Sequence, residues 1–306
     1  MGKIISNIVF TKNRPLQLDA YLGSLYRYFP SHIIQTYVLY KVEFFQAQYE
    51  QLFGKYPGCV VVTEKDFHSD FLNILNRIDT PYILFGIDDV VYFDSVDFEV
   101  IDRTFSECSA DIFGFSLRFG VGNIRDGEDP VTETVVAGRT VYRLDWAQGR
   151  TPVTQYPFEL CATVYPTPLV KKIVYGAMRN SLLSRKLFSP DAFLVGILGK
   201  TKLRRKVLKS FGYFFSPNTL ESWNCRWCQR HSEELPGCLY FQKPCASAIQ
   251  VNMVNVSTDN QSDGGREHTV TALAKEYERG RRLDINYIAK NKPAGTHVGA
   301  EFFKLI

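Results

Sequence analysis

The sequence has no apolar run that approaches the roughly 20 residues needed to cross a lipid bilayer. Residues 1–13 contain no apolar core followed by a small-residue cleavage site, as a secretory leader would. The seven cysteines are an odd-numbered set in a chain of 306 residues. We therefore expect a cytoplasmic protein whose cysteines are free thiols.

Internal repeats, low-complexity tracts and a strong excess of either charge are also missing. The net charge of +4 is too small to indicate any particular partner. Apolar material is plentiful, since 45% of the residues are hydrophobic and 14% are aromatic. That composition is sufficient for one large domain or two small ones, and it is not the composition of a disordered chain.

Strand and helix patterns alternate through the first ninety residues. Short apolar runs predict buried strands at 4–10, 36–40, 59–62 and 82–85. Apolar residues at helical spacing predict a helix after each of the first three strands, at 15–29, 43–53 and 67–78. Asn13 is the expected N-cap of the first helix. This alternation predicts an α/β fold with a mostly parallel central sheet and helices on both faces.

Polar residues follow two of these strands directly. Residues 11–14 come after the first strand, and Asp88 and Asp89 come after the fourth. In parallel sheets, ligands bind beyond the carboxyl ends of the strands, so we expect both segments to border one cleft.

The pattern is looser in the second half of the chain. A Gly-, Asp- and Glu-rich stretch at 119–139 predicts a long surface loop over the cleft. Further strands are expected at 111–118, 140–144, 160–165 and 246–256, and helices at 168–178 and 269–279.

The adjacent carboxylates Asp88 and Asp89 have two interpretations. One of them can accept backbone hydrogen bonds in a turn or helix N-cap. Alternatively, the pair forms a divalent-cation site, because Mg²⁺ and Mn²⁺ prefer carboxylate oxygens and commonly bridge to substrate phosphates.

The run 8–15, followed some seventy residues later by the run 84–90, resembles glycosyltransferases of the GT-A type. The likeness extends in element order over roughly residues 4–300 and is greatest to bacterial and viral surface-polysaccharide transferases, including rhamnosyltransferases. It implies a GT-A (Rossmann-like) fold in which the first loop and the acids of a "DxD" motif bind a nucleotide-diphosphate sugar and Mn²⁺ or Mg²⁺. Here the motif reads Asp88-Asp89-Val90, which leaves open which acid has which role.

The resemblance assigns roles to individual residues. Nucleotide-binding residues would be Thr11, Asn13, Arg14, Asp66 and Asp88, and metal ligands would be Asp89 and the late histidine His297. Lys12 is a further partner for the donor. Asp66 is equally explained as a helix N-cap, Arg14 and Lys12 as a solvated loop, and His297 as a solvated residue of the tail.

The resemblance also implies a catalytic carboxylate at the start of a helix, for which the sequence offers two candidates; the match is partial, because Ser222 stands where the family has a second acid. Glu221 lies in a run that predicts the start of a helix, where we expect it in the first turn and kept ionised by the helix dipole. Helix stabilisation alone is the other explanation for an acid there. Glu159, at the start of the expected strand 160–165, is the rival. A base is required for inversion of the sugar's configuration, which we favour, and not for retention.

Two other segments invite functional readings. Cys225, Cys228, His231, Cys238 and Cys245 approach the spacing of zinc ligands, but a second tight pair is missing, so free thiols are favoured. Residues 200–209 form a basic amphipathic pattern, which is either a solvated helix face or a peripheral membrane contact. No aromatic stacking motif accompanies the charge, so we expect no nucleic-acid partner.

These observations predict a GT-A domain at 1–265, with a nucleotide-sugar half at 1–118 and an acceptor half at 119–265. Residues 266–306 would form a C-terminal helix and tail that close over the active site. The expected activity is metal-dependent transfer of a hexosyl or deoxyhexosyl group to a glycan or a lipid-linked glycan in polysaccharide biosynthesis. A sugar nucleotidyltransferase would need a glycine-rich loop, which 11–15 lacks, and a third reading is an inactive carbohydrate- or partner-binding domain.

Overall fold

The structure is a computed structural model that describes residues 2–107, 112–124, 129–178, 212–234, 237–252 and 268–306. Within these residues, no helix is long and apolar enough to cross a membrane. The basic stretch 200–209 lies outside them.

The first half of the chain forms the parallel core of the sheet. Strands β1 (Ile5–Lys12), β2 (Ile34–Lys41), β3 (Val60–Thr63) and β4 (Tyr82–Ile87) lie in the order β3-β2-β1-β4, all parallel. The connecting helices are α1 (Pro15–Tyr28), α2 (Gln46–Lys55) and α3 (Phe67–Arg77). The α/β fold with a parallel core is thus confirmed.

The second half extends this sheet to nine strands in mixed directions. Strand β9 (Thr163–Pro166) lies antiparallel between β4 and β6 (Ile112–Ser116), and β10 (Gly237–Phe241) runs parallel to β6. Strands β7 (Val131–Val136) and β8 (Arg139–Leu144) form a hairpin at the edge. The prediction of a loop throughout 119–139 is therefore wrong for 131–136, because these residues pair with β8. A tight turn at Ala137 and Gly138, where φ is 51° and 72°, connects the two strands.

A second, three-stranded sheet brings the tail to the acidic pair. It has the order β12-β11-β5, from β5 (Val90–Tyr92), β11 (Ala246–Ile249) and β12 (His297–Val298). The strand predicted at 246–256 ends at Ile249, and residues 253–256 lie outside the described part. The tail helices are α10 (Val270–Glu278), as predicted, and α11 (Ile285–Asn291).

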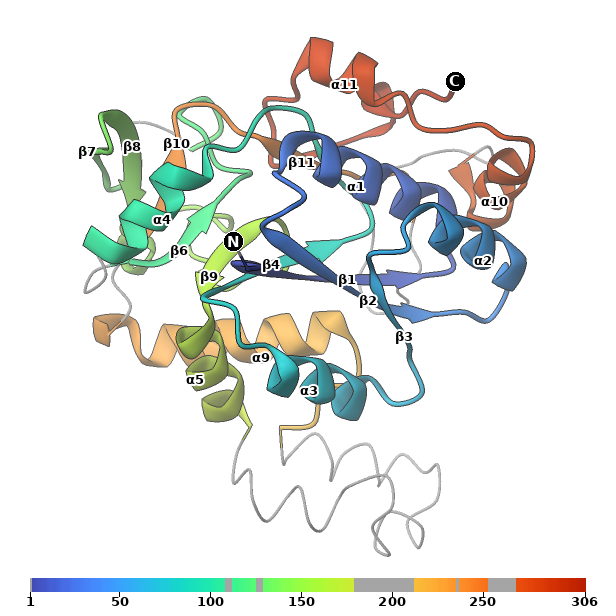
Figure 1. The fold of residues 1–306 in the computed structure, drawn as a ribbon. Coiled ribbons are helices and arrows are strands. Elements are labelled where there is room, and N and C mark those ends of the chain that lie inside the picture. Colours follow the sequence, from blue (N-terminus) through green and yellow to red (C-terminus); the bar gives the residue numbers. More distant parts are fainter. Residues whose placement is uncertain (1, 108–111, 125–128, 179–211, 235–236, 253–267) are drawn as a thin grey trace, which may run out of the picture.

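Helices cover both faces of the large sheet (Figure 1). Helices α1, α2, α10 and α11 lie on one side, and α3, α5 (Thr167–Ala177) and α9 (Pro217–Arg230) on the other; α4 (Phe98–Glu107) lies near β6. The side chains of β1 alternate accordingly: Val9 packs into the core beneath α1, and Ile8 and Phe10 into the core above α3.

Candidate functional site

The acidic pair sits where β4 leaves the sheet. Gly86, two residues earlier, lies against Tyr21 of α1 so closely that a Cβ there would approach the phenol oxygen to 2.0 Å. The backbone N–H of Ile249 donates to the carbonyl of Asp89 at 2.8 Å, which ties the pair to the small sheet. The backbone that carries the two carboxylates is therefore fixed by α1 on one side and by the small sheet on the other.

Asp88 is buried, and each of its carboxylate oxygens accepts a hydrogen bond from the loop after β1. Arg14 Nη1 donates to Asp88 Oδ1 at 2.8 Å, and Thr11 Oγ1 donates to Asp88 Oδ2 at 2.8 Å. Tyr49 of α2 contacts both partners, because its hydroxyl lies 2.9 Å from Thr11 Oγ1 and accepts from the backbone N–H of Arg14 at 2.9 Å. The predicted meeting of the 11–14 segment with the acidic pair is confirmed.

Asp89 is held more loosely. Its Oδ2 lies 3.7 Å from Arg14 Nη1, while its buried Oδ1 has no hydrogen-bond partner in the described part of the chain. Burial, together with the neighbouring charge of Asp88, raises the pKa of Asp89 to about 6, against the opposing effect of Arg14. A buried carboxylate oxygen without a donor is a suitable ligand for a hard cation.

Asn13 and Asp66 have structural roles in the same region. The prediction that Asn13 is the N-cap of α1 is wrong. The N-cap residue is Arg14, whose side chain makes no capping hydrogen bond. Asn13 adopts φ of 54°, which Asn tolerates better than most residues, and its Oδ1 accepts from the backbone N–H groups of Glu43 and Phe44 at 2.9 and 3.3 Å. Asp66 caps α3 by accepting from Ser69 N at 2.9 Å, so the N-cap interpretation is confirmed and a contact to the nucleotide stays a prediction.

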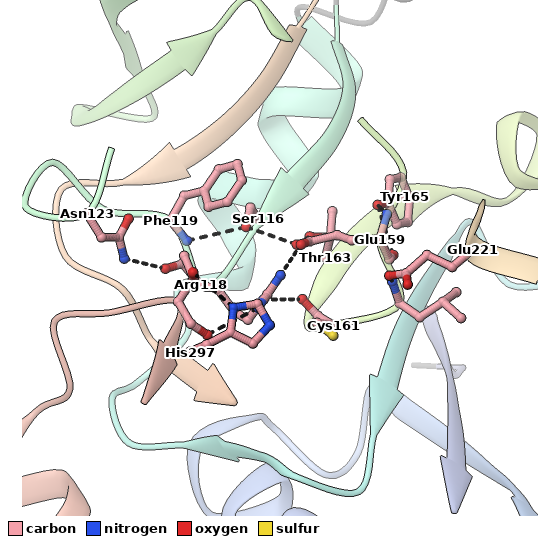
Figure 2. A network of polar contacts seen from close by, with 12 residues as sticks. Ser116, Arg118, Phe119, Asn123, Glu159, Cys161, Thr163, Tyr165, Glu221 and His297 are labelled. Atoms are coloured by element: carbon pink, nitrogen blue, oxygen red, sulfur yellow. Dashed lines mark hydrogen bonds and ion pairs between the residues drawn. The ribbon is translucent and has the colours of Figure 1, made fainter. Parts of the chain in front are cut away.

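Arg118, just beyond β6, organises the other half of the site (Figure 2). Its side chain is 3% exposed. Arg118 Nε donates to the carbonyl of Cys161 at 2.9 Å, and Nη1 donates to the carbonyl of Thr296 at 3.2 Å and lies 3.2 Å from His297 Nε2. Three segments distant in sequence are joined by this one guanidinium.

Glu159 is the counter-charge of Arg118. Its Oε2 forms an ion pair with Arg118 Nη2, and its Oε1 accepts from Thr163 Oγ1 and Ser116 Oγ. Burial is the largest influence on the pKa of Arg118 and lowers it, but the charge and hydrogen bond of Glu159, together with smaller effects of Cys161 and Glu221, outweigh burial and raise the pKa. Both oxygens of Glu159 are thus occupied, and the residue precedes β9 rather than starting it.

Glu221 differs from the prediction in two respects. It is the fifth residue of α9, beyond the first turn, which is closed by a capping box between Ser216 and Thr219. Burial raises the pKa of Glu221 to about 7, so the helix dipole does not keep it strongly ionised. Desolvation has a larger effect on this pKa than the helix dipole, because the carboxyl points toward the interior, where its Oε1 accepts from Leu160 N at 2.9 Å.

His297 reaches the site from the tail. Desolvation of its ring and the charge of Arg118 both lower the pKa of His297, so the imidazole is neutral at pH 7. Its Nε2 faces Arg118, and its Nδ1 lies 3.2 Å from Thr296 Oγ1. Among the residues that the structure describes, no three His, Cys, Asp or Glu side chains gather as a ready-made metal site.

Most predicted residues therefore converge on two linked clusters. We call Thr11, Arg14, Tyr49, Asp88 and Asp89 the acidic cluster, and Arg118, Glu159, Glu221 and His297 the arginine cluster. The charge of Arg118 contributes to lowering the pKa of Asp89, so the two clusters lie close enough for their charges to interact. Two buried acids beside cations, with a carboxyl of raised pKa nearby, are typical of a catalytic site.

Sequence reasoning missed Arg118 and Tyr49. Arg118 closes the expected strand 111–118, and an arginine directly after an apolar strand is the one signal that would have found it. Tyr49 lies within a helix pattern in which an aromatic residue indicates core packing, so its hydroxyl gave no signal.

The cysteines near α9 are core residues. Cys225 and Cys228 are buried residues of α9, and burial raises the pKa of Cys225 to about 12. All six described cysteines are free thiols.

No protein-family model matches the chain. The bifunctional glycosyltransferase pgtA of Dictyostelium discoideum is 22% identical over 210 residues, which cover 61% of this chain and 27% of pgtA. The chain is a distant relative of a glycosyltransferase. Its match thus spans about a quarter of that curated relative's length.

Two solved structures have weak similarity to this one. TarS of S. aureus, residues 1–349, has a TM-score of 0.40 at 16% identity, covering 56% of this chain and 49% of that one. The mannosyltransferase PcManGT of Pyrobaculum calidifontis, in complex with GDP-Man and Mn²⁺, has a TM-score of 0.31 at 11% identity, covering 41% and 37%. The fold assignment rests on the strand order of the chain itself.

Proposed function

We propose that the chain is a glycosyltransferase that moves a sugar from a nucleotide-diphosphate donor to a hydroxyl of a glycan or lipid-linked glycan. The observation that carries this proposal is the acidic cluster at the carboxyl end of the parallel strands, together with a carboxyl of raised pKa on α9 in the arginine cluster. The distant relationship to pgtA supports the same reaction class. We favour a hexosyl or deoxyhexosyl group as the sugar, and a cytoplasmic location with a peripheral membrane contact.

The acidic cluster would bind the donor nucleotide. Asp88 accepts from Arg14 and Thr11, which leaves its carboxylate oriented at the strand end, where a ribose hydroxyl can add a further donor. Arg14 carries the positive charge that a diphosphate requires. Asn13 fixes the loop that carries Arg14 through its hydrogen bonds to Glu43 and Phe44, and Asp66, which follows β3 along the same sheet edge, is the proposed contact for the base.

Asp89 is the proposed ligand of a divalent cation, because its Oδ1 is buried and lacks a donor within the described residues. His297 is its proposed companion from the tail, and this role requires its Nε2 to exchange the contact with Arg118. When bound, Mn²⁺ or Mg²⁺ would neutralise the negative charge that develops on the departing diphosphate.

Glu221 is the proposed base, and the reaction would invert the configuration of the sugar. One oxygen of Glu221 is fixed by Leu160 N, which orients the carboxyl, and its pKa of about 7 suits proton removal near neutral pH. Glu159 is less suited, because both of its oxygens are engaged by Arg118, Thr163 and Ser116. We assign Glu159 to positioning Arg118.

Nucleotide binding tests the donor site directly. A nucleoside diphosphate, tried with each common base, should raise the melting temperature more in the presence of Mn²⁺ than in EDTA. Asp89→Asn should lose the metal-dependent part of this stabilisation, whereas Asp94→Asn, which removes a half-buried acid paired with Lys292, should keep it. Equal stabilisation with and without metal would overturn the cation site, and no stabilisation by any nucleotide would overturn the function.

A further inference from the structure

A hollow of about 350 Å³ lies between the last turn of α5 and α9, outside both clusters. Its volume lies within the range of small-molecule sites. It is lined by Gly176, Trp223, Arg226, Trp227, Arg230 and His231.

The lining follows from helical spacing. The side chains that α9 buries include Leu220, Cys225 and Cys228, and Glu221 projects to that same face. The lining residues of α9 recur three and four positions apart on the opposite face. The hollow is therefore separated from the proposed base by the width of one helix.

Two partly exposed tryptophans give the hollow flat apolar walls. Trp227 stacks on His231 with ring centroids 4.0 Å apart and an interplanar angle of 17°. Its indole approaches α5 so closely that a Cβ on Gly176 would lie 2.4 Å from Trp227 Nε1. Trp223 is one turn earlier on α9. Rigid indole faces provide contact area at little cost in conformational entropy, and they match the apolar face of a pyranose ring.

Two exposed arginines stand beside these walls. Arg226 and Arg230 are four residues apart on α9, so they lie next to each other on its surface. Within the described residues, neither is paired with a carboxylate. A planar guanidinium group can donate two parallel hydrogen bonds to two oxygens of an anionic group such as a carboxylate, sulfate or phosphate.

We propose that this hollow binds a saccharide that bears an acidic group, with the tryptophans against sugar rings and the arginines against the acid. The proposal deepens the proposed function, on which it rests, since the ligand would be the acceptor glycan or its product. Helix α9 then carries both the proposed base and an accessory glycan site on opposite faces. A concave hollow suits such a discrete ligand better than a planar lipid surface.

Tryptophan fluorescence tests the proposal, because the chain has three tryptophans and the third, Trp146, is 4% exposed. An oligogalacturonate should quench the emission saturably, whereas a neutral maltooligosaccharide of equal length should act at least about tenfold more weakly. Arg226→Gln/Arg230→Gln should lose the preference. Arg103→Gln/Arg281→Gln, which makes the same charge change elsewhere, should keep it, and the melting temperatures of both variants verify folding.

Three results would overturn the assignment: equal quenching by acidic and neutral sugars, unchanged quenching in the α9 arginine variant, or a response to phosphatidylserine vesicles alone. The last result would mark the hollow as a membrane contact. Nucleotide-sugar hydrolysis, measured in parallel, separates the two proposals. If the protein hydrolyses a nucleotide sugar but does not bind the acidic saccharide, only the accessory site is refuted. If it binds the acidic saccharide but hydrolyses no nucleotide sugar, only the transferase proposal is refuted.

Discussion

Replacing Glu221 by Gln should change activity and stability in opposite directions. Gln keeps the shape of the side chain and can still accept the hydrogen bond from Leu160 N, which is 2.9 Å long in the native protein. It cannot accept a proton from the sugar acceptor. We therefore expect kcat to fall by about 10²–10⁴-fold, with little change in nucleotide affinity.

The stability change follows from the pKa of Glu221, which burial raises from 4.5 to about 7. A raised folded-state pKa means that stability is fully present below the unfolded value and is lost as pH rises through the folded value. At pH 8, ionised Glu221 therefore costs about 3 kcal/mol, at roughly 1.4 kcal/mol per unit of pKa. Glu221→Gln should recover that amount at pH 8 and have no such effect at pH 4.

Two assays check this prediction together. Urea unfolding at pH 4 and pH 8 gives the stability difference, and a transfer assay from pH 5 to 9 gives the rate. The native rate should rise with pH through about 7, because only the ionised acid accepts a proton. A variant that keeps most of its rate, or that loses stability at pH 8, refutes the assignment of Glu221. If Glu159→Gln then abolishes the rate, the two acids have exchanged roles.

The remaining predictions concern the surroundings of the site. Arg118→Met should destabilise the fold by about 3–5 kcal/mol in urea unfolding, because it leaves Glu159 buried without a counter-charge. The double variant Arg118→Met/Glu159→Gln should regain stability without regaining transfer rate; recovery of both would show that the pair has no positioning role. Tyr49→Phe should weaken nucleotide binding by about 2–10-fold in calorimetry, since Thr11 and Arg14 each lose a hydrogen bond, and unchanged affinity would exclude Tyr49 from donor binding. Residues 200–209 should make the protein sediment with acidic vesicles at low salt and be released as salt rises, and equal behaviour with neutral vesicles would favour a solvated face.

The sequence predicted those parts of the fold that depend on local periodicity. The four parallel strands and their helices follow from the alternation of apolar runs, and the meeting of 11–14 with Asp88 follows from parallel-sheet geometry. The small sheet was not predictable in this way, because its strands are short and distant in sequence: β5 pairs with β11 across more than 150 residues, and β11 pairs with β12 across 49. Strand β7 of the hairpin was missed, although β8 was predicted, because the polar residues of β7 resemble a loop; on an edge strand such residues face solvent.

The same distinction between local sequence pattern and tertiary contact applies to the site. Acids at strand ends and at a helix start are visible in a sequence, so Asp88, Asp89, Glu159 and Glu221 could be singled out. Their states could not, because they depend on tertiary burial and partners. The raised pKa of Glu221 comes from desolvation in the folded chain, and the engagement of Glu159 comes from Arg118, a residue 41 positions away.

Turnover of a nucleotide sugar tests the central claim most directly. Each common nucleotide-diphosphate sugar can be incubated with the protein and Mn²⁺, with released nucleoside diphosphate quantified by chromatography. The account predicts that one donor class is hydrolysed slowly in water and that Asp88→Asn, which removes the charge paired with Arg14, abolishes the release. Asp94→Asn should leave it unchanged. Release that persists undiminished in Asp88→Asn, or the absence of release from every donor, would contradict a glycosyltransferase site at the acidic cluster.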